Sequence, residues 1–350
     1  MTLSSGDRLC VVGAGLAGTG VAYRLRDEPI DVTILEKSRG VGGRAATRRK
    51  EGCRYDHGAN YIKDSDDRTT DLLETLGEDG LADISEPVWT FDAGGEIAPG
   101  DRQETHKWTW QSGITQFAKR LLAETDADVQ KTTRVDTLAR AGGEWTLTDT
   151  DSLNYGPFDA VVLSPPAPQT AELLAETIID GGRPTALSSA TEAVRDVPFR
   201  TIRTFVFQYP FELERPYYAL VNTDREHEIG WLARESCKPG HVPDGQSLLV
   251  VQMAPNWSND NYSVSLEAAA ETVAGMVAEL LGDERLREPG WIDDQGWRYA
   301  LPNDGLDTAC LSDLREYGIY VAGDWLSGNG RAHEAVWCGI DVAETIVENS

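Results

Sequence analysis

The chain has 350 residues, of which 40% are hydrophobic, so it is long enough for two packed domains and is neither disordered nor collagen-like. Its formal net charge of −26 at pH 7 argues against nucleic acid or an anionic membrane as a partner. The acidic residues are spread along the chain, and arginine far outnumbers lysine among the 32 basic residues. This balance predicts a protein from a salt-adapted organism, soluble where salt screens self-repulsion.

Nothing in the sequence predicts export or membrane insertion. The apolar runs, such as 159–163, have the length of a strand, and no signal-type segment precedes the first strand. The five cysteines are scattered and form no CxxC pair. We therefore expect a cytoplasmic protein with reduced thiols, and the spacing of its residues predicts no metal site.

The first half of the chain begins with a βαβ pattern: strand 8–12, helix 16–26 and strand 31–35. Short β-prone runs then fill 129–163 and are separated by turn signals such as Gly142-Gly143. A helix is expected to follow in the segment "PPAPQTAELLAE".

The second half is richer in long strands. Four candidates are expected to share one large sheet: 201–208, 217–222, 228–233 and 247–253. An amphipathic helix at 265–281 follows, and the chain then forms strand 318–322 and a helix from about 332 to 347.

A glycine-rich turn joins the first strand to the first helix. Gly13, Gly15 and Gly18 give GxGxxG with a strand before it and a helix after it, which is the context of a dinucleotide-binding motif. Leu16 and Ala17 then supply N–H groups at the positive end of the helix. We expect a pyrophosphate at this turn.

The end of the second strand indicates the nucleoside. Glu36 can accept hydrogen bonds from a ribose diol, whereas a 2′-phosphate would meet its negative charge. Glu36 therefore predicts FAD or NAD rather than NADP, and the neighbouring Lys37 is also expected to contact the cofactor.

Three further elements favour FAD. Gly43 and Arg44 can fold back on the ribose and pyrophosphate, and Gly323-Asp324 can hold a ribityl chain. The final helix can direct its N-terminus at the flavin N1–C2=O edge. Beside the cofactor we also expect three residues: Val135, His333 and Ala335.

These motifs predict an α/β fold (α+β in its two-domain layout). A discontinuous Rossmann-type FAD-binding domain is expected at 1–63, 101–170 and 296–350. An inserted substrate-binding domain built on a mixed β-sheet is expected at 64–100 and 171–295, with the pocket between the domains.

Six segments of the sequence resemble the flavin amine oxidase superfamily, and within it the renalase group. They are "VVGAGLAG", "ILEKSRGVGGRAATRR", "YDHGANYI", "GWLARESCKPG", "WRYALP" and "YVAGDW". The likeness is dispersed over nearly the whole chain and is weakest in 64–100 and 178–200. The group usually has a second serine where this chain has Cys237.

The resemblance implies oxidation of aberrant dihydronicotinamide isomers of NAD(P)H. The hydride passes to N5 of non-covalent FAD, and O2 is the acceptor and yields H2O2. The sequence shows no Ser/His/Asp or Cys/His constellation, and hydride transfer needs orientation rather than an acid or base.

The segment after the arginine-rich loop supplies the remaining site candidates. The residues expected to reach the flavin are His57, Gly58, Ala59, Asn60 and Tyr61. For His57 the alternative, which the sequence favours, is that it only ties its own loop to the backbone. Asn60 can donate to and accept from a carboxamide.

Two tryptophans and two cations complete the predicted substrate pocket. Trp231 and Trp297 are candidate walls, with packing in the core as the alternative. Arg234 and Lys238 are candidate phosphate contacts, with a solvated strand face as the alternative.

Three other functions stay open at this point. A flavin amine oxidase would need an aromatic pair and a pocket for a neutral amine. A desaturase-type flavin oxidase would need an apolar, membrane-facing surface. A flavin protein without a catalytic role, such as a redox sensor, would hold FAD with no preferred organic donor.

Overall fold

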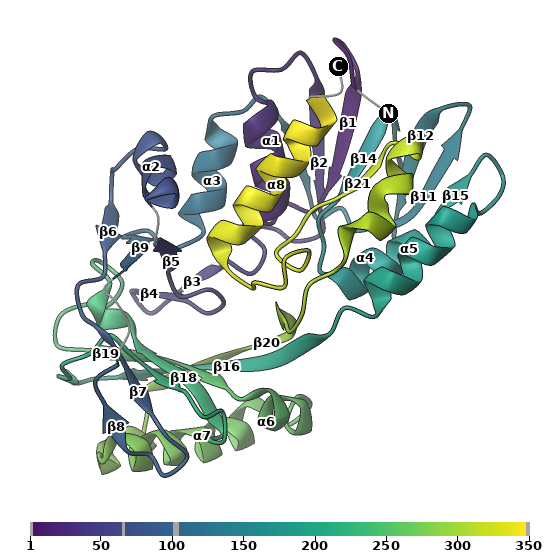
Figure 1. Ribbon diagram of the computed structural model, residues 1–350. Coiled ribbons are helices and arrows are strands. Elements are labelled where there is room, and N and C mark those ends of the chain that lie inside the picture. The colour runs from purple at the N-terminus through teal and green to yellow at the C-terminus, as the bar shows by residue number, and fades with distance from the viewer. Residues whose placement is uncertain (1–2, 65–66, 101–104, 348–350) are drawn as a thin grey trace. The chain divides into compact units, whose positions relative to one another are not determined.

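The computed structural model describes residues 3–64, 67–100 and 105–347 (Figure 1). It divides into two compact units, and the chain passes between them four times. Unit 1 consists of Met1–Ala45, Thr115–Phe199 and Leu301–Ser350, and unit 2 consists of Ala46–Ile114 and Arg200–Ala300. Each unit has its own sheets and its own hydrophobic core.

Unit 1 is built on a five-stranded parallel sheet. Its inner strands are short apolar runs buried on both faces, as expected when helices cover a parallel sheet. The strand order is β10 (Asp128–Lys131), β2 (Asp31–Glu36), β1 (Arg8–Val12), β14 (Ala160–Leu163) and β21 (Ile319–Val321).

Helix α1 (Leu16–Leu25) packs closely against α8 (Ala332–Val347). Two glycines make this approach possible. A Cβ on Gly20 would lie 2.6 Å from the Val336 carbonyl oxygen, and a Cβ on Gly339 would overlap the Ala17 carbonyl. Helix α3 (Gln116–Ala123) also packs on α1.

A second, four-stranded sheet completes unit 1. It shares its core with two helices and the 3-10 segment Thr308–Tyr317. The strand order is β13 (Asn154–Phe158), β12 (Glu144–Asp149), β11 (Val135–Ala141) and β15 (Ile178–Ile179), and the helices are α4 (Ala167–Ala175) and α5 (Thr185–Arg195).

Unit 2 is built on a seven-stranded mixed sheet whose core is covered by α7 (Leu266–Leu281). The sequence alternates along these strands, so that Phe205, Phe207 and their neighbours face α7. The strand order is β20 (Trp291–Pro302), β16 (Phe199–Tyr209), β19 (Ser247–Met253), β18 (Ile229–Arg234), β17 (Ala219–Asn222), β7 (Val88–Phe91) and β8 (Ile97–Ala98).

Smaller strands and helices make up the rest of unit 2. The hairpin of β3 (Thr47–Lys50) and β4 (Cys53–Asp56) packs Cys53 and Tyr55 on Val206 and Val250. The others are β5 (Ile62–Asp64), β6 (Leu81–Asp83), β9 (His106–Trp110), α2 (Arg68–Thr75), α6 (Pro255–Asp260) and the 3-10 segments Glu235–Cys237 and Glu284–Arg287.

The predicted α/β fold class is confirmed, and the predicted large sheet exists. The compact units divide the chain at other residues than the predicted domains. Residues 46–63 belong to unit 2, because the β3–β4 hairpin packs on β16 and β19. Residues 171–199 belong to unit 1, because α4 and α5 share the core of its sheets. Residues 105–114 and 296–300 also fall in unit 2, while 101–104 and 348–350 lie outside the described residues.

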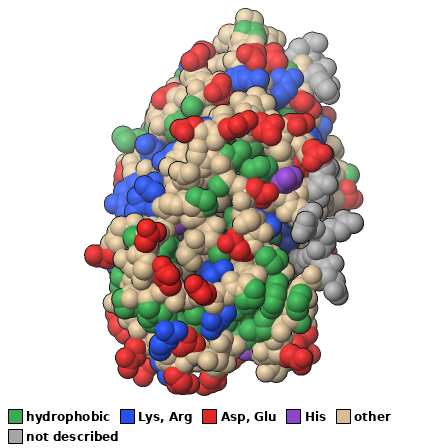
Figure 2. Space-filling view, turned by 90° about the vertical axis from the view of Figure 1, so that its left-hand side faces the viewer, with side chains coloured by type: hydrophobic (Ala, Val, Ile, Leu, Met, Phe, Trp, Pro, Cys, Tyr) green, Lys and Arg blue, Asp and Glu red, His purple; other side chains and the backbone are tan. Residues whose placement is uncertain are grey.

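The cysteines and the acidic side chains are distributed in the fold as they are in the sequence, without disulfide pairs and without an acidic patch on the face shown in Figure 2. All five cysteines are free thiols. On the face shown in Figure 2, acidic side chains are scattered rather than gathered in one patch. No helix in the described part of the chain is long and apolar enough to span a membrane.

Candidate functional site

The first and third glycines of the motif are required by the protein itself. Gly13 has φ +102°, and a Cβ there would lie 2.7 Å from Ser164 Oγ. A Cβ on Gly18 would overlap the Gly13 carbonyl. Ser164 was not predicted; its hydroxyl lies 2.8 Å from the carbonyl oxygen of Val12, at the end of β1.

Gly15 is different, because no protein atom requires it to be glycine. Its φ of −71° is open to any residue, and a Cβ there would meet nothing within 4 Å. Gly15 is also the N-cap of α1, and no side chain caps this helix end. The open space and the N–H groups of the first turn, at Leu16 and Ala17, therefore fit a pyrophosphate in close contact with the backbone.

Glu36 lies at the end of β2 and is only 6% exposed. Its Oε2 accepts a hydrogen bond from the Ala14 N–H and its Oε1 accepts one from the Ser38 N–H, both at 2.7 Å. A carboxylate has about four acceptor positions, so the ribose hydroxyls can still bind. The neighbouring Lys37 donates to Gln169 at 3.2 Å.

Val135 lies near Glu36 in the fold, although the two residues are far apart in the sequence. The Thr133 N–H donates to the Glu36 carbonyl at 2.9 Å, and Val135 opens β11 two residues later with 8% exposure. The structure thus places this predicted cofactor residue near the end of β2.

The arginine-rich loop lies against the GxGxxG turn, as its position in the sequence predicts. Gly42 forms a bridge with Gly15, and its N–H donates to the Ala14 carbonyl at 2.8 Å. A Cβ on Gly43 would come within 3.2 Å of Gly15 Cα. The two glycine-rich segments therefore form one continuous cradle.

Arg44 and Asp324 were predicted separately and form an ion pair. Arg44 Nη2 lies 2.7 Å from Asp324 Oδ1, and the aspartate is 4% exposed. The pair joins the loop after β2 to the turn after β21. The negative charge expected at a ribityl chain is therefore fixed by the arginine expected at the pyrophosphate.

The turn after β21 leads towards α8. The Gly323 N–H lies 3.2 Å from the Cys338 sulfur, and a Cβ on Gly323 would come within 2.5 Å of Trp325 Nε1. His333 and the buried Ala335 lie in the first turn of α8. Gly13, Glu36 and Gly323 thus follow or end three parallel strands at the carboxyl edge of one sheet, where such folds bind ligands.

Unit 2 holds the other predicted residues. His57 is 5% exposed, and its ring stacks on Trp297 at 5.4 Å between centroids. Trp297 Nε1 donates to the His57 carbonyl at 2.9 Å. Burial, aided by the charge of Arg48, lowers the pKa of His57 to about 4. The ring is therefore neutral at pH 7, and its Nδ1 has no hydrogen-bond partner among the described residues.

Asn60 and Trp231 belong to one aromatic cluster with Tyr61 and Tyr218. Trp231 lies 6.2 Å from Tyr61 and 6.3 Å from Tyr218 between ring centroids. The Tyr218 hydroxyl donates to the Asn60 carbonyl at 3.4 Å, and Asn60 Nδ2 donates to the Gly58 carbonyl at 3.2 Å. Asn60 Oδ1 and Trp231 Nε1 are buried and have no partner among the described residues, so this cluster has unused hydrogen-bonding capacity.

Two residues of this region were missed by the sequence analysis. Thr204, Gln252 and Trp231 are neighbours across β16, β19 and β18, and their side chains share one face of the sheet. Gln252 Nε2 donates to the Gly58 carbonyl at 2.7 Å and so ties the segment of Gly58, Ala59 and Asn60 to the sheet. Thr204 Oγ1 is also buried without a partner in the described structure.

Lys238 does not have the predicted role of a phosphate contact. Its Nζ lies 2.8 Å from Asp56 Oδ2 and 3.0 Å from Glu235 Oε1, and all three side chains are 0% exposed. Burial opposes its charge, but the two carboxylates raise the pKa of Lys238. Because the ammonium is enclosed by carboxylates, it cannot meet a ligand.

His241 completes this buried cluster. Its Nδ1 lies 3.1 Å from Glu235 Oε2 and its Nε2 lies 3.0 Å from the Trp110 carbonyl oxygen. Both ring nitrogens face acceptors, and against the effect of burial Glu235 raises the pKa of His241. As an imidazolium, His241 balances the cluster at two negative and two positive charges. The ligand atoms of Asp56, Glu235 and His241 lie within 4.8 Å of one another, a spacing that could hold a metal ion. The Lys238 ammonium, however, contacts both carboxylates.

Arg234 likewise lies away from solvent, at 8% exposure. It donates to the carbonyl oxygens of Tyr217 and Leu213 at 2.8 and 2.9 Å. Arg234 also donates to the sulfur of Cys237 at 3.0 Å, so Cys237 has a structural role as a partner of this guanidinium. The predicted phosphate contact is therefore wrong for Arg234 too, since its donors serve backbone carbonyls.

Two parts of the chain match known protein families. Residues 11–76 match the NAD(P)-binding Rossmann-like domain, and residues 89–347 match the family described as flavin containing amine oxidoreductase. Mouse renalase is 29% identical over 179 residues, which cover 49% of this chain and 51% of renalase. Protoporphyrinogen oxidase 2 of Arabidopsis thaliana is 37% identical over 73 residues, covering 21% of this chain and 14% of that protein.

The chain therefore spans about half or less of the curated relatives it matches. A solved structure of a putative protoporphyrinogen oxidase from Exiguobacterium sp. 255-15 shares the fold, with a TM-score of 0.78 at 15% identity over 99% of this chain and 100% of the other. That solved structure shows the fold alone, whereas the family match over residues 89–347 supports FAD as the cofactor and oxidoreduction as the class of chemistry. The chain belongs to the flavin containing amine oxidoreductase family and is similar to mouse renalase over about half of its length.

Proposed function

We propose that this protein oxidises aberrant dihydronicotinamide isomers of NAD(P)H, with O2 as the acceptor and H2O2 as the product. In unit 1, the cradle of Gly13, Gly15 and Gly43 would hold the pyrophosphate, Glu36 the adenosine ribose, and the Arg44–Asp324 pair the ribityl chain. FAD, when bound, supplies the group that accepts a hydride. Unit 2 would bind the donor.

The observation that carries this proposal is the unused hydrogen-bonding capacity in the aromatic cluster of unit 2. Asn60 Oδ1 offers an acceptor and Trp231 Nε1 a donor, and Tyr61 and Tyr218 pack on the same tryptophan. A flat ring bearing a carboxamide offers the matching donor and acceptor, whereas an isoprenoid chain would leave both atoms unpaired at a cost. The match to mouse renalase supports the same substrate class.

The same residues would orient the donor without moving a proton. His57 is neutral at pH 7. Trp297 stacks on the His57 ring and holds His57 in position by donating a hydrogen bond to the His57 carbonyl. Hydride transfer needs alignment of the donor carbon and exclusion of water more than it needs an acid or base. The neutral His57 and the aromatic walls would serve these two ends.

We expect the FAD-loaded protein to lose its flavin absorbance rapidly when mixed anaerobically with NADH isomers prepared by borohydride reduction of NAD+. The isomers reduced at ring position 2 or 6 should bleach the flavin, and ordinary NADH should not. Asn60→Ala and Trp231→Phe should slow the bleaching roughly tenfold each, because each removes one hydrogen bond to the carboxamide.

Trp89→Phe serves as the control, since Trp89 is a partly buried tryptophan of the same sheet that packs on Tyr217. Bleaching by simple amines but by no isomer would contradict the proposal and favour an amine oxidase. A flavin that no organic donor reduces would favour a protein without a catalytic role.

We further propose that the acidic surface is an adaptation to concentrated salt. It is supported by the net charge of −26 and the scatter of acidic side chains in Figure 2. Salt at 1 M shortens the Debye length to about 3 Å and so screens the repulsion among these charges. The melting temperature should rise between low and molar potassium chloride; an unchanged or falling value would refute the adaptation.

A further inference from the structure

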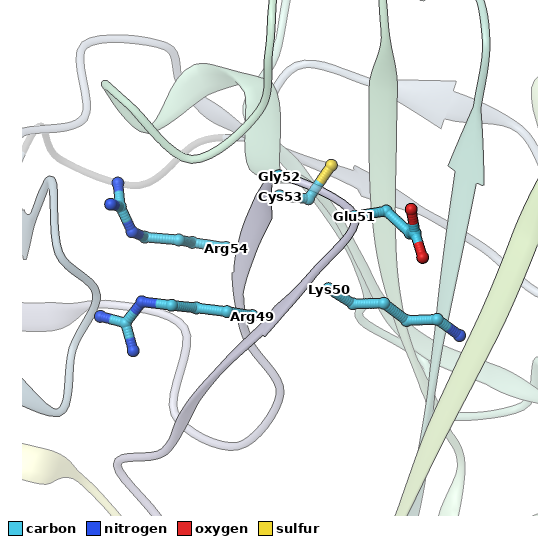
Figure 3. A pocket seen from close by; sticks show the side chains of 6 residues that line it. All are labelled: Arg49, Lys50, Glu51, Gly52, Cys53 and Arg54. Carbon is cyan, nitrogen blue, oxygen red and sulfur yellow. The ribbon is translucent and has the colours of Figure 1, made fainter.

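The β3–β4 hairpin of unit 2 carries a basic feature that the site described above does not use. Its turn, Glu51-Gly52, has positive φ at both residues, 50° and 79°, and residues 49–54 line a hollow of about 300 Å³. In the antiparallel register, Arg49 lies directly opposite Arg54. Figure 3 shows both arginine side chains extending from the same side of the hairpin.

The cations on the other face of the hairpin are already satisfied. Arg48 Nη1 lies 3.0 Å from Asp293 Oδ2, and Lys50 Nζ donates to the Ile292 carbonyl at 2.9 Å. Figure 3 shows Lys50 and Glu51 directed away from the two arginines. Arg48 and Lys50 thus attach the hairpin to β20 and are not available to a ligand.

Arg49 and Arg54 donate only to neutral backbone carbonyls. Arg49 Nη2 donates to Ser112 at 3.2 Å, while Arg54 Nη1 donates to Gln111 at 3.2 Å and to Gly240 at 3.0 Å. No carboxylate of the described residues forms an ion pair with either guanidinium, and Arg54 Nε is buried without a partner among them. Two like charges directly opposite each other on paired strands destabilise the pair, so this arrangement favours an anion between them.

We propose that Arg49 and Arg54 form a binding site for a phosphate-class oxyanion, either free or as the phosphate of a nucleotide. Two planar guanidinium groups present several N–H donors that match the oxygens of phosphate. A hollow of this size fits a small anion. The net charge of −26 opposes a polyanionic macromolecule, whereas a small anion within a Debye length of about 8 Å responds to the local pair.

The test is isothermal titration of the FAD-loaded protein with inorganic pyrophosphate. Bound FAD keeps the ligand away from the cradle at Gly15, so a second phosphate site can be detected. Arg49→Gln should weaken pyrophosphate binding roughly tenfold, because it removes one charge-assisted contact. Arg54→Gln should do the same, but Arg49→Gln is decisive, since Arg54 also holds the carbonyls of Gln111 and Gly240.

Arg195→Gln, on the exposed surface of α5, is the matched control and should bind pyrophosphate as the unaltered protein does. NAD+ distinguishes the source of the phosphate: Arg49-dependent binding that is tighter for NAD+ than for pyrophosphate supports a nucleotide ligand, and the reverse order supports the free anion. Binding of neither anion, or equal binding by Arg49→Gln, would overturn the proposal.

Tighter Arg49-dependent binding of a poly-glutamate peptide would also overturn it, in favour of an acidic protein partner. The proposal does not rest on the proposed oxidase function. A protein that binds pyrophosphate through Arg49 but is bleached by no dihydronicotinamide isomer would keep this site and lose that function.

Discussion

Replacing Glu36 with alanine is expected to yield a protein that is nearly free of flavin when purified. The carboxylate holds the N–H groups of Ala14 and Ser38 and would hold the ribose hydroxyls as well. Hydrogen bonds to a charged group contribute about 1.5–3 kcal/mol each, so FAD affinity should fall at least roughly a hundredfold. Flavin absorbance per protein, followed by titration of the apoprotein with FAD, measures the loss.

Glu192→Ala removes an exposed carboxylate of α5 in the same unit and should bind FAD normally. The circular dichroism of Glu36→Ala should resemble that of unaltered apoprotein, which separates lost binding from lost folding. A folded Glu36→Ala that retains FAD at full stoichiometry and affinity would show that the ribose lies elsewhere.

Lys238→Met should be the most destabilising single change in unit 2. It leaves Asp56 and Glu235, both at 0% side-chain exposure, with only His241 to balance two negative charges. Removing one partner of a buried ion pair costs about 3–5 kcal/mol, because the remaining charge is neither solvated nor paired. Denaturant-induced unfolding, followed by tryptophan fluorescence, measures the shift in the transition of this unit.

Lys119→Met, at an exposed position of α3, is the control and should change stability by less than about 0.5 kcal/mol. The double change Asp56→Asn with Lys238→Met restores the charge balance and should recover part of the loss. Equal stability of Lys238→Met and the unaltered protein would mean that the cluster is hydrated, contrary to its burial.

The parts of the fold that follow from local patterns could be predicted from the sequence. The βαβ opening, the strands at 247–253 and 8–12, and the helix at 332–347 depend on periodicity and turn residues that lie within each segment. The dinucleotide cradle could also be predicted, because GxGxxG and the loop of Gly43 and Arg44 are each a contiguous motif in the sequence.

What the sequence could not give were pairings between distant residues. Arg44 and Asp324 were each expected near the cofactor, yet nothing in their separate motifs indicates that they pair. The roles of Gly20 and Gly339 likewise depend on the approach of α1 to α8. Such contacts are decided by packing between segments that lie far apart in the chain.

Lys238 shows why charge alone misled the prediction of a ligand site. A lysine in a polar segment is normally on the surface. Here Asp56, 182 residues away, supplies the partner that permits burial. Glu235 and His241 stand close by in the sequence, so four ionisable residues in two short segments were the one available signal of a buried network.

The four passages of the chain between the units have a consequence for synthesis on the ribosome. Unit 2 is contained in residues 46–300, whereas the sheet of unit 1 needs β21, and α1 needs α8, which begins at Ala332. All the residues of unit 2 therefore leave the ribosome before the dinucleotide cradle has its last strand and helix. Uptake of the flavin is accordingly expected only after β21 and α8 have been translated.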